Sequence, residues 1–302
     1  MWQLHSASNA VKTLLPRPAE HQLRKLVRTV RPRPLHISEV AAYGGGFEQV
    51  YILRQAGLDI RGRDFLEVGT GWAPVIPLIL SLAGARHIYL TDAYELLNLE
   101  GLKASVAFLR DRIGDLALRL NLTESEIKQK LTISATDDFS VALKAFDMSY
   151  HVPFDYRNGN VKVDVIFGQG VLEHIPPSII KKLLDDARQI LRTGGMISHA
   201  IDNSDHREHG DNRLSRIDFL KYSDRVWSYL CLHPQDFTNR LRHSDYVKMV
   251  EEAGFVIVYE RSFVEANARD AISNFPLAGR FQGRKPDDLA AIHSSFIAKL
   301  PG

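Results

Sequence analysis

Short apolar runs alternate with helical patterns along most of this chain. The run at residues 65–68 is interrupted only by Glu67 and breaks at a glycine turn, and residues 75–82 follow as an apolar stretch of helical length. Similar short runs lie at residues 87–91 and 163–167. Runs of this kind are typical of strands buried on both faces. Because the strands alternate with helices, the pattern predicts a doubly wound α/β sheet that is mostly parallel.

Three further strands are predicted in the second half of the chain. A helix over residues 178–191 ends at the pair Gly194-Gly195, and residues 196–201 form the strand after it. Residues 255–259 and 294–300 provide the two last strands. Together with the strand discussed next, these bring the expected sheet to seven strands.

The third strand has two candidate positions. We place it at residues 146–152, because that run directly precedes the loop before the next strand, and residues 131–135 are the alternative. The first choice leaves a helical insertion at about residues 105–145. Thr123 and Glu126 have capping-box spacing within it. The fold class predicted is therefore a Rossmann-like seven-stranded sheet with an insertion before strand three.

Residues 1–63 are expected to be a helical N-terminal addition to a domain over residues 64–302. Residues 12–33 contain seven basic residues and one acid. Four aliphatic residues there have the spacing of an amphipathic helix: Leu23, Leu26, Val27 and Val30. Such a basic helix either packs on the core or contacts an anionic membrane surface or a phosphorylated substrate. Residues 44–46 are three glycines that mark a flexible joint, either a lid or a plain loop.

The amino-acid composition adds little to the predicted fold, but it argues against several classes of protein. The 302 residues are 45% hydrophobic and 25% charged, as in an ordinary globular protein. With 38 basic and 36 acidic residues, there is no global electrostatic basis for binding nucleic acid. Cys231 is the only cysteine, which excludes an internal disulfide and a thiolate-only metal cluster. No apolar run approaches the ~18 residues of a membrane span and no signal-peptide pattern opens the chain, so a cytoplasmic location is expected.

The turn Gly69-Thr70-Gly71 has the features of a nucleotide-binding turn. Glycines permit positive φ and a close approach of ligand to backbone, and the following helix begins with free N–H groups. Glu67 ends the first strand, where its carboxylate could meet hydroxyl or ammonium groups. Asp92 ends the second strand, about 20 residues after the turn, where an acid binds a pair of ribose hydroxyls. Two carboxylates would then flank one ligand.

Four motifs in this order resemble those of class I S-adenosylmethionine-dependent methyltransferases. They are residues 66–71, Asp92, residues 164–175 and residues 191–195. The resemblance spans roughly residues 60–202 and the two last strands. The segment Val171-Leu172-Glu173-His174-Ile175 is common in the branch that acts on small molecules, lipids and glycans. The turn departs from the family, which often has a third glycine where this chain has Trp72-Ala73-Pro74.

The resemblance implies a role for each matching residue. Glu67 would accept a hydrogen bond from the amino-acid end of S-adenosylmethionine, the turn at residues 69–71 would pass beneath it, and Asp92 would hold both ribose hydroxyls. Gly168 and Gln169 end the fourth strand and would line the path to the methyl group.

The acid that family members commonly carry after strand three, near the adenine, has no certain equivalent. Tyr150 and His151 occupy its place if strand three is at residues 146–152, and Asp137 does so on the alternative.

Candidate catalytic residues follow strands four and five. His174 is either a structural group beneath the cofactor, as is frequent in the family, or a base, and His199 is either a core histidine or a base. Beyond strand five, five acids and histidines lie close together: Asp202, Asp205, His206, Glu208 and His209. This run is a solvated loop, a source of a base such as Asp202 or His206, or a site for a divalent metal ion.

The sequence therefore predicts a methyltransferase that uses S-adenosylmethionine, with O-methylation of a small-molecule, glycan or lipid hydroxyl preferred. The segment at about residues 203–245 is expected to face the acceptor, and its aromatic residues at 219–229 form either core or acceptor pocket. Nucleic acid is disfavoured, since Gly168-Gln169-Gly170 stands where amino-methylating enzymes of DNA carry an aromatic–proline motif. The alternatives are a noncatalytic cofactor-fold binding protein and a NAD-dependent oxidoreductase, which usually has a third glycine and another strand order.

Overall fold

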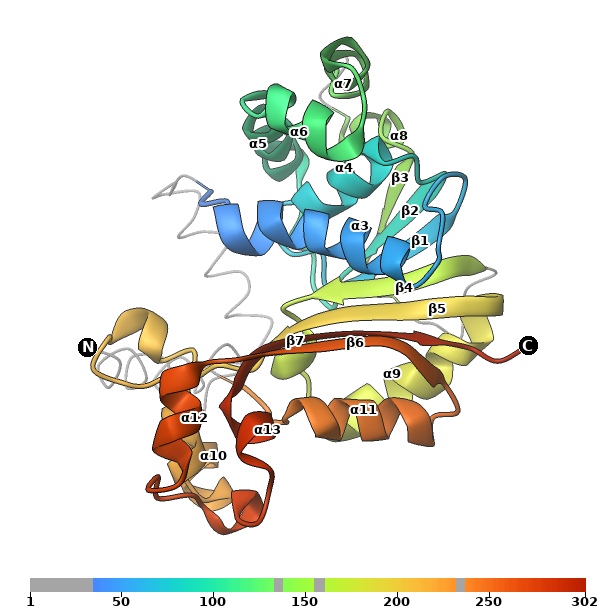
Figure 1. Ribbon diagram of the computed structural model, residues 1–302. Coiled ribbons are helices and arrows are strands. Elements are labelled where there is room, and N and C mark those ends of the chain that lie inside the picture. Colours follow the sequence, from blue (N-terminus) through green and yellow to red (C-terminus); the bar gives the residue numbers. More distant parts are fainter. Residues whose placement is uncertain (1–34, 133–137, 155–160, 232–236) are drawn as a thin grey trace.

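Seven strands form one mixed sheet in the computed structural model, which describes residues 35–132, 138–154, 161–231 and 237–302 (Figure 1). The strand order is β3-β2-β1-β4-β5-β7-β6. The strands are β1 (Asp64–Val68), β2 (His87–Thr91), β3 (Met148–His151), β4 (Val163–Gln169), β5 (Leu191–Asp202), β6 (Val256–Val264) and β7 (Ala291–Lys299).

The first five strands pair in parallel, while β7 runs antiparallel between β5 and β6. The strand order changes direction between β1 and β4. From β1 the chain continues to β2 and β3 on one side of the sheet, and from β4 it continues to β5 on the other side. Ligands of open α/β sheets bind outside the carboxyl ends of the strands at such a reversal. The predicted Rossmann-like sheet of seven strands is confirmed. The antiparallel β7 distinguishes it from the order 3-2-1-4-5-6 of dinucleotide-binding domains.

Helices cover both faces of the sheet (Figure 1). Successive strand residues point to opposite faces, so Phe65 packs into the core on one side and Leu66 into the core on the other. The first core is built with η1 (Glu39–Gly44), α3 (Gly45–Gln55), α4 (Val75–Leu82), α5 (Leu99–Arg110), α6 (Ile113–Leu120), α7 (Glu124–Lys130) and α8 (Phe139–Lys144). The second core is built with α9 (Pro177–Ile190) and α11 (His243–Glu252).

A third, smaller core lies beyond the end of β5. It is built from η4 (Asp218–Lys221), α10 (Asp224–Leu230), α12 (Ala266–Ile272), η5 (Gly279–Phe281) and α13 (Pro286–Ala290). Phe219 and Trp227 are buried in it, and Tyr222 packs against them. These aromatic residues are therefore core residues of this region.

The third strand occupies the position chosen from the sequence. Tyr150 of β3 pairs with Leu90 of β2. In the alternative position, Leu131 is the C-cap of α7, and residues 133–137 lie outside the described residues. Helices α5 to α8 fill the segment between β2 and β3. The predicted capping box at Thr123 and Glu126 begins α7.

The glycines at residues 44–46 do not form a joint. They lie in one continuous helical segment, in which η1 runs directly into α3. A Cβ on Gly46 would come within 2.4 Å of Ile79 Cδ1, and one on Gly45 within 3.1 Å of the Gln169 side chain. The prediction of a flexible joint or a plain loop is therefore wrong, because residues 44–46 are helical and Gly45 and Gly46 serve the close packing of α3.

The predicted basic helix within residues 12–33 lies outside the described residues, so its contact with a membrane surface stays a prediction. Within the described ranges, no helix combines the length and the apolar character needed to cross a membrane.

Candidate functional site

The glycine turn lies at the reversal of strand order and is held against the end of β2. The backbone N–H groups of Gly69 and Thr70 both donate to the Thr91 carbonyl, at 2.9 and 3.1 Å. The Thr91 hydroxyl in turn donates to the Glu67 carbonyl at 2.5 Å. Gly69 and Gly71 have φ values of 77° and 70°, which residues with a side chain rarely adopt. The turn therefore has the backbone conformation predicted for it.

Two close approaches fix the surroundings of the turn. A Cβ on Gly69 would lie 2.9 Å from Val171 Cγ2, so the motif after β4 packs directly on the turn. A Cβ on Gly101 of α5 would lie 2.2 Å from the Trp72 carbonyl oxygen. At the place where the family often has a third glycine, this chain thus has a backbone contact with α5.

Asp92 points back at the turn. Its carboxylate accepts a hydrogen bond from the Gly71 N–H, with distances of 3.2 and 3.1 Å to its two oxygens, and one from the Tyr150 hydroxyl at 2.9 Å. The Tyr150 hydroxyl also accepts from the Leu96 N–H at 3.0 Å. Burial raises the pKa of Asp92 to about 6. The structure therefore brings together three of the residues predicted to bind the cofactor.

His151 lies apart from this group. Its Nε2 is 2.9 Å from the Ser149 hydroxyl, and its ring contacts Tyr89. Neighbouring residues of a strand face opposite sides of the sheet, so Tyr150 faces Asp92 and His151 does not. Asp137, the alternative residue near the adenine, lies outside the described residues.

Glu67 is a buried carboxylate whose Oε2 has no hydrogen-bond partner among the described residues. Burial raises the pKa of Glu67 to about 8, and the charge of Asp92 adds to this effect. A buried polar atom without a partner is costly, so natural proteins keep one mainly where a ligand completes it. Glu67 therefore suits a ligand that carries a hydrogen-bond donor or a positive charge.

A second polar group lies at the carboxyl end of β4 and beneath α3. The Gln49 side chain donates to Gln169 Oε1 at 3.2 Å and accepts from the Ser198 hydroxyl at 2.7 Å. Next to it, Glu48 accepts from Gln169 at 3.5 Å and lies 3.0 Å from His293 Nε2. The predicted role of Gln169 on the path to the methyl group stays a prediction.

Sequence reasoning missed Glu48, Gln49 and His293. For Glu48 and Gln49 the only local signal was the pair Gly45-Gly46, which we interpreted as a joint; His293 had none. His293 belongs to β7, where it pairs with Asp202 of β5.

A third polar group joins the turn after β4 to the loop after β5. Glu173 and His174 lie in η2 (Leu172–His174), and His206 follows β5. One ligand-type atom from each of these three residues lies within 4.8 Å of those of the other two. Asp202 Oδ2 is 3.3 Å from His206 Nε2, and the Asp202 N–H donates to Glu173 Oε1 at 3.2 Å. Three of the predicted catalytic residues, His174, Asp202 and His206, are therefore brought together.

The charges of this group are coupled. Burial raises the pKa of Glu173 to about 7 and lowers the pKa of His174. Burial also lowers the pKa of His206, but the negative charges of Asp202 and Glu173 raise it by more. The pKa of His206 is therefore above its ordinary value. The pKa of Asp202 stays well below its usual range, because His206 and Ser204 outweigh the effect of its burial.

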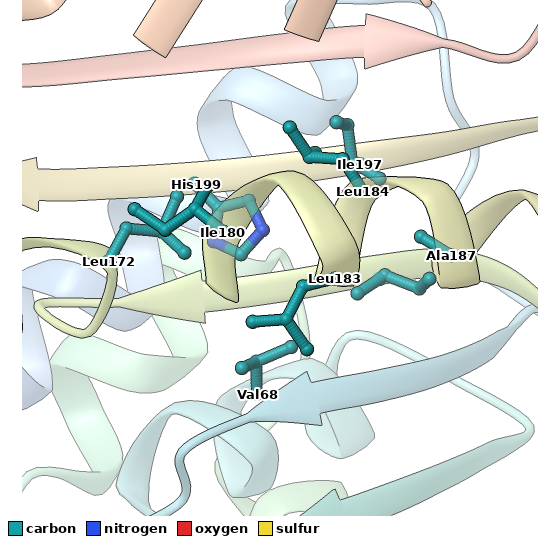
Figure 2. A pocket seen from close by; sticks show the side chains of 9 residues that line it. Val68, Leu172, Ile180, Leu183, Leu184, Ala187, Ile197 and His199 are labelled. Carbon is teal, nitrogen blue, oxygen red and sulfur yellow. The ribbon is translucent and has the colours of Figure 1, made fainter. Parts of the chain in front are cut away.

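The fourth predicted catalytic residue, His199, is set apart from the other three. It faces an apolar pocket between the sheet and α9, where Figure 2 shows its ring among aliphatic side chains. The pocket is lined by Val68, Ile166, Leu172, Ile180, Leu183, Leu184, Ala187, Ile197 and His199. Burial lowers the pKa of His199 to about 4, so the imidazole is neutral near pH 7. Its Nδ1 would lie 2.8 Å from a Cβ on Gly168, so this glycine accommodates the ring.

No family model matches this chain, and no curated protein matches its sequence. Three solved structures of similar fold are methyltransferases. An S-adenosylmethionine-dependent methyltransferase from Mesorhizobium loti is 12% identical, with a TM-score of 0.46, over 82% of this chain and 96% of that chain. Magnesium protoporphyrin IX methyltransferase from Synechocystis, with bound SAH, is 11% identical, with a TM-score of 0.45. That match covers 93% of this chain and 94% of the other.

Phosphoethanolamine N-methyltransferase 2 from Haemonchus contortus, in complex with S-adenosyl-L-methionine, is 14% identical, with a TM-score of 0.46. That match covers 84% of this chain and 52% of the other. At such identities the similarity concerns the fold alone, so it assigns no activity and no substrate to this chain.

Proposed function

We propose that this protein is a methyltransferase that uses S-adenosylmethionine. The observation that carries the proposal is the pair of buried carboxylates, Glu67 and Asp92, on either side of a glycine turn at the reversal of strand order. A protein that used the fold only as a scaffold would have no need of a buried carboxylate with one oxygen, Oε2 of Glu67, left without a hydrogen-bond partner among the described residues.

The residues around the turn fit the groups of this cofactor. Gly71 leaves backbone bare beneath a ligand, because space is open at its Cβ position, whereas the Cβ position of Gly69 is covered by Val171. The partnerless oxygen of Glu67 suits the ammonium of an amino-acid group. Asp92, held in place by Gly71 and Tyr150, suits a pair of ribose hydroxyls.

S-adenosylmethionine supplies a methyl group on a sulfonium, which is already a good leaving group. The protein therefore has to align the acceptor and take up its proton. Gln169, at the end of β4 and in contact with both Gln49 and Glu48, is placed to position the acceptor. In the absence of a bound metal ion, we expect His206, next to Asp202, to receive the proton.

We propose a small-molecule, glycan or lipid hydroxyl as the acceptor and expect no nucleic acid. The polar groups beside Gln169 are side chains of both charges, Glu48 and His293 among them, and they suit a neutral polyhydroxylated ligand better than a polyanion.

Calorimetric titration of the purified protein with S-adenosylmethionine and, separately, with NAD tests the proposal. We expect one equivalent of S-adenosylmethionine to bind and NAD to give no saturable heat. Binding of NAD alone would instead indicate an oxidoreductase. Cell extract supplied with methyl-labelled cofactor should then yield a labelled product that depends on the protein. Cofactor binding without any such product would favour the noncatalytic alternative.

Tyr150→Phe is expected to weaken S-adenosylmethionine binding roughly 10- to 100-fold at pH 7, the effect of one hydrogen bond to a charged group. The lost hydroxyl donates to Asp92 and favours its ionised form, so the pKa of Asp92 should rise and the loss should be larger at pH 6. Calorimetry at pH 6 and pH 8 measures this. Tyr229→Phe, at an exposed hydroxyl, is the matched control. Equal affinities for Tyr150→Phe and the wild-type protein would contradict the role given to Tyr150.

A further inference from the structure

We propose that Glu173, His174 and His206 form a binding site for one divalent transition-metal ion. The three residues come from two separate segments, η2 after β4 and the loop after β5. Each offers one ligand-type atom, and these atoms all lie within 4.8 Å of one another. A tetrahedral ion at about 2.0–2.2 Å from its ligands holds them about 3.3–3.6 Å apart, so the three side chains would draw closer together when they bind it.

The Glu173 carboxylate indicates that this group of three residues binds a cation. Its side chain is 3% exposed, and its Oε1 accepts a hydrogen bond from the Asp202 N–H at 3.2 Å. Its Oε2 is buried and has no partner among the described residues. A carboxylate oxygen left in this state is costly, and a cation beside it would remove the cost.

His174 is oriented as metal-binding histidines usually are. Its Nδ1 lies 2.9 Å from the Phe237 carbonyl oxygen, which can only accept a hydrogen bond. The proton of a neutral His174 ring is therefore on Nδ1, and the lone pair is on Nε2. A backbone carbonyl on the far nitrogen is the outer partner that fixes the tautomer of a ligating histidine.

The carboxylate oxygen Asp202 Oδ2 lies 3.3 Å from His206 Nε2, a buried nitrogen that has no hydrogen-bond partner among the described residues. A carboxylate–histidine pair beside a metal orients the ring and strengthens it as a ligand. The ring of His206 lies 5.0 Å from the ring of His174, centroid to centroid. Both histidines are more exposed than Glu173, so an ion can approach the group from their side.

Asn239 holds the turn that carries two of the ligands. Its side-chain amide donates to the Leu172 and Ile175 carbonyls at 2.7 and 2.9 Å, and its own N–H donates to the Glu173 carbonyl at 2.8 Å. Asn239 is itself buried and accepts from the Tyr246 hydroxyl at 3.0 Å. A site fixed in this way loses little freedom on binding an ion.

The donor set selects the class of ion. Two imidazole nitrogens and one carboxylate oxygen suit Zn²⁺, Fe²⁺, Mn²⁺ or Co²⁺, whereas Ca²⁺ and Mg²⁺ prefer oxygen ligands alone. Three protein ligands also leave coordination positions open for a further ligand.

A role in the reaction rests on the proposed methyltransferase function. Asp202 pairs across the sheet with His293, which contacts Glu48 at 3.0 Å, so the metal group adjoins the proposed acceptor side. An acceptor oxygen bound to the ion would have a lowered pKa, and His206, as a ligand of the ion, would no longer be free to receive its proton, which would pass to solvent.

The test uses the full-length protein without an affinity tag, freed of metal with a chelator and then dialysed. Zn²⁺ is titrated by calorimetry, and Co²⁺ is titrated by visible absorption, which reports the coordination number. We expect one equivalent of each ion to bind, with Co²⁺ bands typical of four or five ligands. His174→Ala and His206→Ala should each lower the affinity at least 100-fold.

His209→Ala is the matched control, because the His209 ring stacks on His206 at 5.2 Å but does not belong to the group. Its affinity should stay within threefold of the wild type. Glu173→Gln should behave like the histidine variants. If that buried change prevents folding, judged by circular dichroism, the more exposed His174→Ala decides.

The proposal is overturned if neither ion binds more tightly than about millimolar, or if His174→Ala and His206→Ala bind both ions as the wild type does. The same calorimeter separates this from the proposed function. Binding of Zn²⁺ without binding of S-adenosylmethionine would support the metal site and contradict the methyltransferase function. Binding of S-adenosylmethionine without binding of Zn²⁺ would support the methyltransferase function and contradict the metal site.

Discussion

Asp92→Ala is expected to lower the affinity for S-adenosylmethionine at least 100-fold. The Asp92 carboxylate is 8% exposed and is aimed at the turn by the Gly71 N–H and the Tyr150 hydroxyl. Removing it would cost a ribose two charge-assisted hydrogen bonds, about 3 kcal/mol or more, which corresponds to 100-fold or more in affinity. Calorimetric titration of the variant measures this directly.

Two further variants make this result specific. Asp92→Asn keeps the shape of the side chain but loses the charge and one acceptor oxygen, so at least a tenfold loss is expected. Asp59→Ala removes an exposed carboxylate that pairs with Arg61, and it should bind like the wild type. If Asp92→Ala binds S-adenosylmethionine normally, the ribose role of Asp92 is wrong, and the proposed function loses its main support.

Glu67→Gln is expected to raise the stability of the free protein at pH 8. The folded-state pKa of Glu67 is about 8, against an ordinary value of 4.5. Between these two values the folded protein keeps a proton that the unfolded chain releases, so the free energy of unfolding falls as pH rises. For a pKa shift of this size, the free energy of unfolding falls by about 3 to 5 kcal/mol in total. Glutamine cannot ionise, so the variant should lack this part of the pH dependence.

Denaturant unfolding at pH 5 and pH 8 measures the effect. The two proteins should differ little at pH 5, and the variant should be more stable by several kcal/mol at pH 8. Glu124→Gln, at an exposed carboxylate paired with Lys128, is the control and should follow the wild type. Identical pH profiles for Glu67→Gln and wild type would contradict the raised pKa.

The same residue should make cofactor binding pH-dependent. An ammonium group beside Glu67 favours the ionised carboxylate, so binding at pH 7 should release a proton, and affinity should rise between pH 6 and pH 8. Titrations in buffers of different ionisation enthalpy count that proton. In Glu67→Gln the affinity should be lower, and its rise with pH should be reduced to the contribution of Asp92.

The cofactor side of the site could be predicted because it depends on local patterns. An apolar run shows where a buried strand ends, and the carboxyl ends of parallel strands meet at one edge of a sheet. Glu67 and Asp92 could therefore be placed near each other from the sequence. The choice between Tyr150 and His151 needed the direction of each side chain, and a register error of one residue reverses that direction.

The other side of the site depends on contacts that no local pattern records. Glu48 and His293 are 245 positions apart and meet only because α3 packs over the sheet and β7 enters it. The glycines at residues 44–46 misled the prediction for a physical reason. Glycine permits both a flexible chain and a close helix contact, and the sequence alone does not distinguish the two.

The place of β7 also sets an order of assembly during synthesis. β6 is made before β7, yet it joins the sheet only through β7. Until residues 291–299 leave the ribosome, β5 is an open sheet edge and β6 has no partner, a state in which strands are prone to pair with other chains. The two residues that donate to Asp92, Gly71 and Tyr150, have both been synthesised long before that point. The half of the candidate site that contains Asp92 can therefore form early, whereas the half that contains His293 is completed only when the sheet closes.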